Sequence, residues 1–209
     1  EQRQGRDKQI FRNFRAIAAL QHCAFQLGRH CAEWFSKRLH NDQGMDGTIM
    51  QLSKNFSLNE FTKSSTALRR GIDNSVKDKE HLENLKHLVE HICQPTREYF
   101  GKPVIVTSGY RSPELNAAIG GSATSQHCKG EAVDMEIPGV SNVKLANWIT
   151  NNCNFDQVIL EFYNPDEGPN SGWVHASLKR EGENRKMKMV AYTDGSSTKY
   201  TQIENWSNI

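Results

Sequence analysis

The sequence predicts an α+β fold, with a mostly antiparallel sheet and flanking helices. Apolar residues recur at helical spacing in the first half of the chain. From residue 103 onward, short β-branched or alternating segments typical of strands predominate. Helical patterns interrupt these strands instead of preceding them all. The order of segments therefore indicates helices first, then a sheet with helices inserted between its strands.

Composition is typical of a globular protein and gives no sign of a highly charged partner. The chain has 209 residues, of which 36% are hydrophobic and 24% charged, with a net charge of +2. We therefore expect neither nucleic-acid binding nor attraction to a membrane surface, and we expect a monomer. No apolar run approaches the ~20 residues of a spanning helix, so membrane insertion is not expected.

The expected location is the cytoplasm at synthesis. The early apolar run "AIAAL" is too short for a secretory signal. The five cysteines are odd in number and contain no C-x-x-C pair. This pattern favours free thiols in a reducing compartment.

The N-terminal segment is expected to be separate from the main domain. Residues 8–39 carry phenylalanines and aliphatic residues at roughly helical spacing, which predicts a helix. The stretch "HNDQGMDG" (40–47) then breaks the pattern with two glycines. We expect an extension over 1–48, helical and of unknown role, followed by a domain over 49–209.

Helices of the main domain are marked by caps and apolar stripes. Ser57 and Glu60 form an S-x-x-E capping box that opens a short helix. Ser112 followed by proline indicates another helix start. Longer amphipathic patterns predict helices over 78–98 and 141–151.

The predicted strands are five. "PVIVTSGY" and "QVILEFY" are β-branched apolar runs, "EAVDMEI" and "GWVHASL" alternate, and "KMKMVAY" follows the same rule. These segments cover 103–110, 131–137, 157–163, 172–178 and 186–192.

"HLVEH" (87–91) matches the inverted zinc-protease motif H-x-x-E-H. At ~100° per residue the apolar stripe of this helix centres near Leu85 and Ile92, on the face opposite to both histidines. A catalytic metal needs a walled cleft. We therefore interpret this motif as an exposed helix face.

The stretch "SATSQHCKGEAVDMEI" (122–137) raises a metal-site hypothesis. Alternate residues of a strand share a face, so Asp134 points away from the apolar row of its strand. In "GWVHASL", His175 likewise lies opposite an apolar row. If these two strands pair, His175 lies next to Asp134, and the loop with His127 can fold over them.

Two histidines and one carboxylate form a ligand set typical of catalytic zinc, in which an open position holds a water with a pKa near ~7. Spacing alone leaves two interpretations open. The histidines are either zinc ligands or hydrogen-bonded residues of the core.

Three separated motifs resemble the hedgehog/D-alanyl-D-alanine peptidase superfamily. They are S-G-Y-R-S at 108–112, S-x-H-x-x-G-x-A-x-D at 125–134, and W-x-H at 173–175. The resemblance extends from "MQLSKNFSLNEFTKS", similar to the opening of small phage-type members, to about Tyr192. Members include zinc D-alanyl-D-alanine carboxypeptidases, L-alanyl-D-glutamate endopeptidases and many phage endolysins.

This resemblance implies the hedgehog/D-alanyl-D-alanine peptidase-like fold and one catalytic Zn²⁺ bound by His127, Asp134 and His175. It also implies that Arg111 lies in the cleft near the substrate carbonyl or carboxylate, a task that suits a planar bidentate donor. The other substrate-binding residues implied by the motifs are Tyr110, Ser125 and Trp173.

The general base is predicted less directly. Many members carry an acidic residue three positions before the last histidine, but here that position is Gly172. Glu161, at the end of the apolar strand "QVILE", is the proposed base and proton shuttle, because an unpaired carboxylate there is costly without a task. Glu136, on the same face as Asp134, is the alternative base.

The expected function is zinc-dependent hydrolysis of peptide bonds in bacterial peptidoglycan stem peptides, with phage cell-wall lysis as an expected setting. The bond is either D-Ala-D-Ala, as in a carboxypeptidase, or L-Ala-D-amino acid, as in an endopeptidase. A second hypothesis is a non-catalytic zinc-binding module of a virion or cell-wall-associated protein. A Glu161 directed toward the metal favours the enzyme, and an outward-facing Glu161 favours the module.

Overall fold

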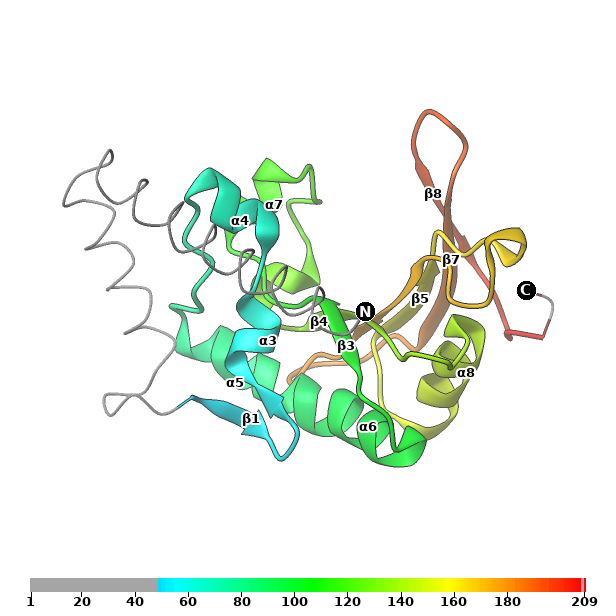
Figure 1. Cartoon of the computed structure of the whole chain (residues 1–209), viewed down its shortest axis with the longest axis horizontal. Coiled ribbons are helices and arrows are strands. Elements are labelled where there is room, and N and C mark those ends of the chain that lie inside the picture. Colours follow the sequence, from blue (N-terminus) through cyan, green and yellow to red (C-terminus); the bar gives the residue numbers. More distant parts are fainter. Residues whose placement is uncertain (1–48, 208) are drawn as a thin grey trace, which may run out of the picture. The chain divides into compact units, whose positions relative to one another are not determined.

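The computed structural model describes residues 49–207 and 209 (Figure 1). The helix expected over 8–39 and the extension expected over 1–48 lie outside the described residues. The division of the chain at residue 48 therefore stays a prediction.

A six-stranded sheet forms the centre of the domain. Its strand order is β3-β4-β6-β5-β7-β8, and every neighbouring pair is antiparallel except β5 and β7, which are parallel. The predicted α+β class with a mostly antiparallel sheet is confirmed. The strands are Ile105–Ser108 (β3), Ala132–Glu136 (β4), Gln157–Glu161 (β5), Trp173–Ser177 (β6), Met187–Thr193 (β7) and Thr198–Gln202 (β8).

The helices form where the sequence supplies caps. The side chain of Glu60 accepts the backbone N–H of Ser57 at 2.8 Å, as the capping box predicts, and Ser112 accepts from the backbone N–H of Leu115 at 3.3 Å. The α-helices are Leu58–Thr62 (α3), Ser65–Arg70 (α4), Lys79–Leu88 (α5), Gln94–Phe100 (α6), Pro113–Ala118 (α7) and Asn142–Asn152 (α8).

Shorter elements complete the domain. A two-stranded ribbon pairs Gln51–Ser53 (β1) with Phe56–Ser57 (β2). A π-helical turn, Val89–Cys93 (η1), joins α5 to α6, and 3₁₀ turns cover Gln126–Lys129 (η2) and Pro165–Glu167 (η3). The helix predicted over 78–98 is thus nearly continuous over 79–100, with one wide turn in its middle.

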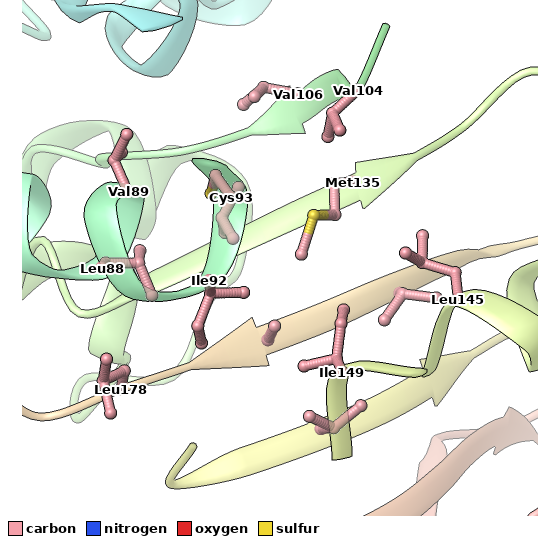
Figure 2. Close-up of a cluster of buried hydrophobic side chains, with 14 of the residues drawn as sticks. Leu88, Val89, Ile92, Cys93, Val104, Val106, Met135, Leu145, Ile149 and Leu178 are labelled. Atoms are coloured by element: carbon pink, nitrogen blue, oxygen red, sulfur yellow. The ribbon is translucent and has the colours of Figure 1, made fainter. Parts of the chain in front are cut away.

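One face of the sheet is buried against the helices. Figure 2 shows Leu88 and Ile92 of the long helix and Ile149 of α8 in one cluster with Met135 of β4. Each of these four side chains is fully buried. Burying an aliphatic side chain of this size contributes about 1.5–3 kcal/mol, which makes this layer the main source of stability. The opposite face of the sheet carries Asp134 and His175.

Three elements were not predicted from the sequence. These are the β1–β2 ribbon, helix α4 and strand β8. Every residue of β8 is exposed, so "TKYTQ" has no buried face and shows no apolar alternation. Its pairing with β7 is decided by the turn between them, in which Asp194 accepts the backbone N–H groups of Ser196 and Ser197 at 2.9 Å.

Two findings concern expectations on location. Among the described residues, no helix combines the length and apolar character needed to cross a membrane. Cys93, Cys128 and Cys153 are free thiols, as the scattered spacing of the cysteines indicates.

Candidate metal centre

Strand register brings two of the predicted ligands together. Strand β4 pairs with β6 so that Asp134 lies directly opposite His175. Their neighbours Val133, Met135 and Val174 point into the core on the other face. The facing deduced from alternation is therefore confirmed, and it leaves an aspartate and a histidine side by side on the polar face.

The third predicted ligand completes a compact triangle. His127 Nε2 lies 3.3 Å from Asp134 Oδ1 and 3.2 Å from His175 Nδ1, and His175 Nδ1 lies 2.9 Å from Asp134 Oδ1. All three side chains are buried. Among the described residues, these three are the group of histidine, cysteine or acidic side chains that could hold a metal ion.

The tautomer of His127 is fixed by the backbone. Its Nδ1 lies 2.7 Å from the carbonyl oxygen of Gly109, and since a carbonyl only accepts, Nδ1 carries the proton. Nε2 of the neutral ring then presents a lone pair toward the Asp134 carboxylate. Two acceptors that face each other at 3.3 Å are the arrangement that a shared cation relieves.

The triangle fits zinc in spacing and in donor type. Two donors that each lie about 2.0–2.1 Å from a tetrahedral zinc are about 3.3 Å apart. The observed separations of 2.9–3.3 Å are close to that value. Two imidazole nitrogens and one carboxylate oxygen are also a ligand set that zinc commonly takes at catalytic sites.

Arg111 contacts the aspartate directly. Its Nη2 donates to Asp134 Oδ2 at 2.8 Å, and its Nε donates to Ser108 Oγ at 2.9 Å. The Arg111 side chain is 17% exposed. The guanidinium therefore occupies the aspartate oxygen that does not face the histidines. This contact orients Asp134 and keeps a positive charge beside the site.

The electrostatics favour a charged aspartate and a neutral histidine. Burial opposes ionisation of Asp134, but His127 and His175 outweigh it and hold the pKa of Asp134 well below its usual range. Burial also lowers the pKa of His127, and the attraction of Asp134 offsets this only in part. These are the protonation states that metal ligation requires.

Glu161 lies on the same face of the sheet as the triangle. It pairs with Trp173 across β5 and β6, while Ile159, two residues earlier, pairs with His175. Burial raises the pKa of Glu161, and the nearby charges of His175 and Arg111 act in the opposite direction. A half-buried carboxylate with a raised pKa beside the site is positioned as a general base requires.

A tight local geometry sets the position of Glu161. Gly172 has a φ of +65°, and a Cβ there would overlap the backbone carbonyl of Glu161. Phe162, next to Glu161, also has a positive φ, of 53°. An acidic side chain therefore cannot occupy position 172 without moving strand β5. The chain instead supplies a carboxylate from β5 itself.

The remaining predicted residues have different surroundings. The Tyr110 side chain is 5% exposed and packs in the core, with its ring 6.0 Å from that of His81. Ser125 precedes η2, and its carbonyl oxygen accepts the backbone N–H of Cys128 at 3.1 Å. The indole N–H of Trp173 is buried and makes no hydrogen bond of ordinary length within the described residues, but it lies close enough to the Glu161 carboxylate to help lower the pKa of that group. Glu136 lies at the far end of β4, opposite Ile105.

Two supporting residues were missed by sequence reasoning. Gly109 lies against helix α3, where a Cβ would be 2.5 Å from the carbonyl oxygen of Phe61. Asp156 is fully buried and binds Arg185. It also accepts from Nε2 of Gln126, the residue before His127, at 3.2 Å. The strand-end position of Asp156 next to an apolar run is the signal that could have identified it.

The H-x-x-E-H segment lies on the solvent side of the long helix. Glu90 and His91 are exposed, and the rings of His87 and His91 lie tilted at 38° to each other with centroids 4.1 Å apart. His91 Nδ1 contacts the carbonyl oxygen of His87 at 2.9 Å. The interpretation of this motif as an exposed helix face is confirmed.

Comparison with known families agrees with this geometry. The family model for peptidase M15 matches residues 54–166, more than half of the 209 residues. The matched range includes His127, Asp134 and Glu161 and ends before Trp173 and His175. No curated protein matches the chain. The fold fits the hedgehog/D-alanyl-D-alanine peptidase-like architecture. By the extent of the family match, the chain belongs to the peptidase M15 family.

Proposed function

We propose that this protein is a zinc-dependent peptidase that hydrolyses peptide bonds in bacterial peptidoglycan stem peptides. The observation that carries the proposal is the convergence of His127 Nε2, Asp134 Oδ1 and His175 Nδ1 beside a half-buried Glu161. His127, Asp134 and His175 would hold the ion. Membership of the M15 family supports peptidase activity and a zinc cofactor.

The residues around the triangle divide the chemistry between them. When bound, zinc supplies Lewis acidity that activates water at neutral pH. Glu161 accepts the proton of the attacking water. Its pKa is raised, and therefore lies closer to neutral pH than the pKa of an exposed glutamate. Glu161 then donates that proton to the leaving amine.

Charge stabilisation is assigned to Arg111. The Arg111 guanidinium lies beside Asp134 and is 17% exposed, so one face remains available to a substrate oxygen. A fixed donor of this kind stabilises negative charge that develops during peptide hydrolysis. The buried Trp173 indole N–H lies beside Glu161 and lowers the pKa of its carboxyl, so Trp173 is assigned to orienting the proposed base, with its ring bordering the substrate.

Stem peptides are the proposed substrates because the sequence motifs resemble those of peptidases that cleave them. The cationic Arg111 suits either a terminal carboxylate, as in a carboxypeptidase, or a scissile carbonyl, as in an endopeptidase. A role in phage cell-wall lysis is the setting we propose. Glu161 lies on the face of the sheet that carries the metal triangle, which favours the enzyme over a non-catalytic zinc-binding module.

The test is mass spectrometry of purified peptidoglycan digested by the full chain. Parallel digests use a chelator, chelator followed by added zinc, and the His127→Ala variant. We expect release by the untreated protein, loss with chelator, recovery with zinc and no release by His127→Ala.

Each product has a distinct meaning. Free D-alanine identifies a carboxypeptidase, and cut stem peptides identify an endopeptidase. If the protein binds zinc but releases nothing from several wall types, the peptidase proposal is wrong and the zinc-binding module takes its place.

A further inference from the structure

The β7–β8 hairpin extends the face of the sheet that carries the candidate site. Strand β5 pairs with β7 so that Glu161 lies opposite Ala191, and β7 pairs with β8 so that Ala191 lies opposite Tyr200. Directly opposed residues in neighbouring strands project from the same face of a sheet. Glu161, Ala191 and Tyr200 therefore form one row on the face of the metal triangle.

This row leaves room for the tyrosine to lie toward the site. Ala191 is fully buried and has the smallest side chain of the three, so no bulky group separates Tyr200 from Glu161. The Tyr200 side chain is 53% exposed. Burial raises the pKa of its phenol, the negative charges of Glu161 and Asp134 act in the same direction, and Arg111 acts in the opposite one. Tyr200 is therefore near the site and also accessible.

The candidate groups follow the strand order of the sheet. Arg111 follows β3, Asp134 is on β4, His175 on β6 and Glu161 on β5, and Tyr200 on β8 is the last. Arg111 and Tyr200 thus lie on opposite sides of the metal triangle. Figure 1 shows the β7–β8 hairpin rising beyond the rest of the sheet on the β8 side.

We propose that Tyr200 is a substrate-contacting residue, which binds the part of the peptide on the Glu161 side of the scissile bond. Its ring packs on the peptide, and its hydroxyl donates to a peptide carbonyl or carboxylate. This inference rests on the proposed peptidase function and adds a specificity residue from a hairpin that lies beyond the M15-matched range.

The same hairpin supplies a matched control. Tyr192 is in β7 next to Ala191, so it projects from the opposite face. Its side chain is 47% exposed, close to the 53% of Tyr200. Substitutions at the two tyrosines therefore remove the same chemical group from the same hairpin, but only one of them faces the site.

The experiment measures steady-state kinetics of stem-peptide hydrolysis by the full chain and by Tyr200→Phe, Tyr200→Ala and Tyr192→Ala. Loss of binding away from the reacting atoms raises KM and leaves kcat nearly unchanged. We expect KM to rise about 3- to 10-fold in Tyr200→Phe, which loses one hydrogen bond. KM should rise further in Tyr200→Ala. In Tyr192→Ala, KM should equal that of the unsubstituted protein.

Substrate length gives a second readout. A peptide truncated on the Glu161 side of the scissile bond no longer reaches Tyr200, so Tyr200→Ala and the unsubstituted protein should hydrolyse it with equal KM. Thermal unfolding of each variant confirms that the hairpin change leaves the domain folded.

The outcomes separate the two proposals. An unsubstituted protein that is inactive on all stem peptides contradicts the proposed function itself. Active protein with the same KM in Tyr200→Ala and Tyr192→Ala overturns only the assignment of Tyr200. A loss of kcat without a change of KM also overturns it, because that pattern belongs to a residue at the reacting atoms.

Discussion

Gly172 lies directly against the backbone of Glu161, so closely that a Cβ at Gly172 would overlap the Glu161 carbonyl oxygen. This contact leaves no room for an acidic side chain at position 172, and the base that we propose comes from β5. Gly172 directly precedes the strand that carries His175, and its φ of +65° is one that residues with a side chain rarely adopt. The same contact therefore allows the two strands to pack closely and keeps the proposed base on β5.

Substitution of Gly172 should be strongly destabilising. We expect Gly172→Ala to lower the free energy of unfolding by about 1–2 kcal/mol because its backbone is left-handed. Overlap of the new Cβ with β5 should lower it by about 1–3 kcal/mol more. Gly71 has a φ of +67° and nothing within 4 Å of its Cβ position. Gly71→Ala should therefore lower the free energy of unfolding only by the cost of the left-handed backbone. Chemical denaturation of both variants measures the difference, and equal losses would contradict the steric argument.

The assignment of the general base can be tested against its alternative. Glu161→Gln should lower kcat by about 10²–10⁴-fold, the usual contribution of general base catalysis, and leave the zinc content unchanged. Glu136→Gln should remain close to the unsubstituted protein, since Glu136 lies at the far end of β4, opposite Ile105. The reverse result would assign the base to Glu136. Zinc analysis of each variant excludes loss of metal as the cause.

Metal content should depend on the triangle alone. We expect about one zinc per chain, lost in His127→Ala, because three protein ligands define a catalytic zinc site. His91→Ala changes an exposed histidine of the H-x-x-E-H segment and should keep the full zinc content. Elemental analysis after dialysis measures both. Zinc lost from His91→Ala instead would place the metal on the helix.

Gly109 should affect metal affinity through His127. A Cβ at this position would be 2.5 Å from the Phe61 carbonyl oxygen, so Gly109→Ala must shift the backbone that accepts from His127 Nδ1. Loss of such a supporting contact typically weakens metal binding about 10- to 100-fold. Competition with a fluorescent chelator measures this change. An unchanged affinity would mean that Gly109 does not orient the ring.

Asp156 should make stability dependent on acid pH. Burial opposes its ionisation, but hydrogen bonds from Arg185 and Lys179 outweigh that effect and lower the pKa of Asp156. Because the folded pKa lies below the unfolded value of about 3.9, this stabilisation is present above that pH and is lost as pH falls below it. Asp156 is fully buried but Arg185 is 46% exposed, so loss of the carboxylate charge should cost less than the ~3–5 kcal/mol typical of a fully buried pair.

The measurement compares Asp156→Asn with the unsubstituted protein by chemical denaturation at pH 7 and pH 3, with chelator throughout. The gap in unfolding free energy should be largest at pH 7 and smaller at pH 3. A gap that is the same at both values would show that the aspartate charge does not stabilise the fold.

The sequence by itself determined which residues we propose as ligands and the faces on which two of them lie. The two-residue period of strands placed Asp134 and His175 opposite the apolar rows, and spaced motifs added His127. Caps at Ser57 and Ser112 predicted two helix starts, which the structure confirms. Each of these inferences depends on residues a few positions apart, where local geometry is sufficient.

Only the tertiary structure decided how these faces meet. Strands β4 and β6 are far apart in sequence, and their register, which aligns Asp134 with His175, depends on packing of the whole core. The same holds for the parallel pairing of β5 with β7, which no local pattern encodes. It brings Tyr200, from a strand with no buried face, to the side of the sheet that carries Glu161.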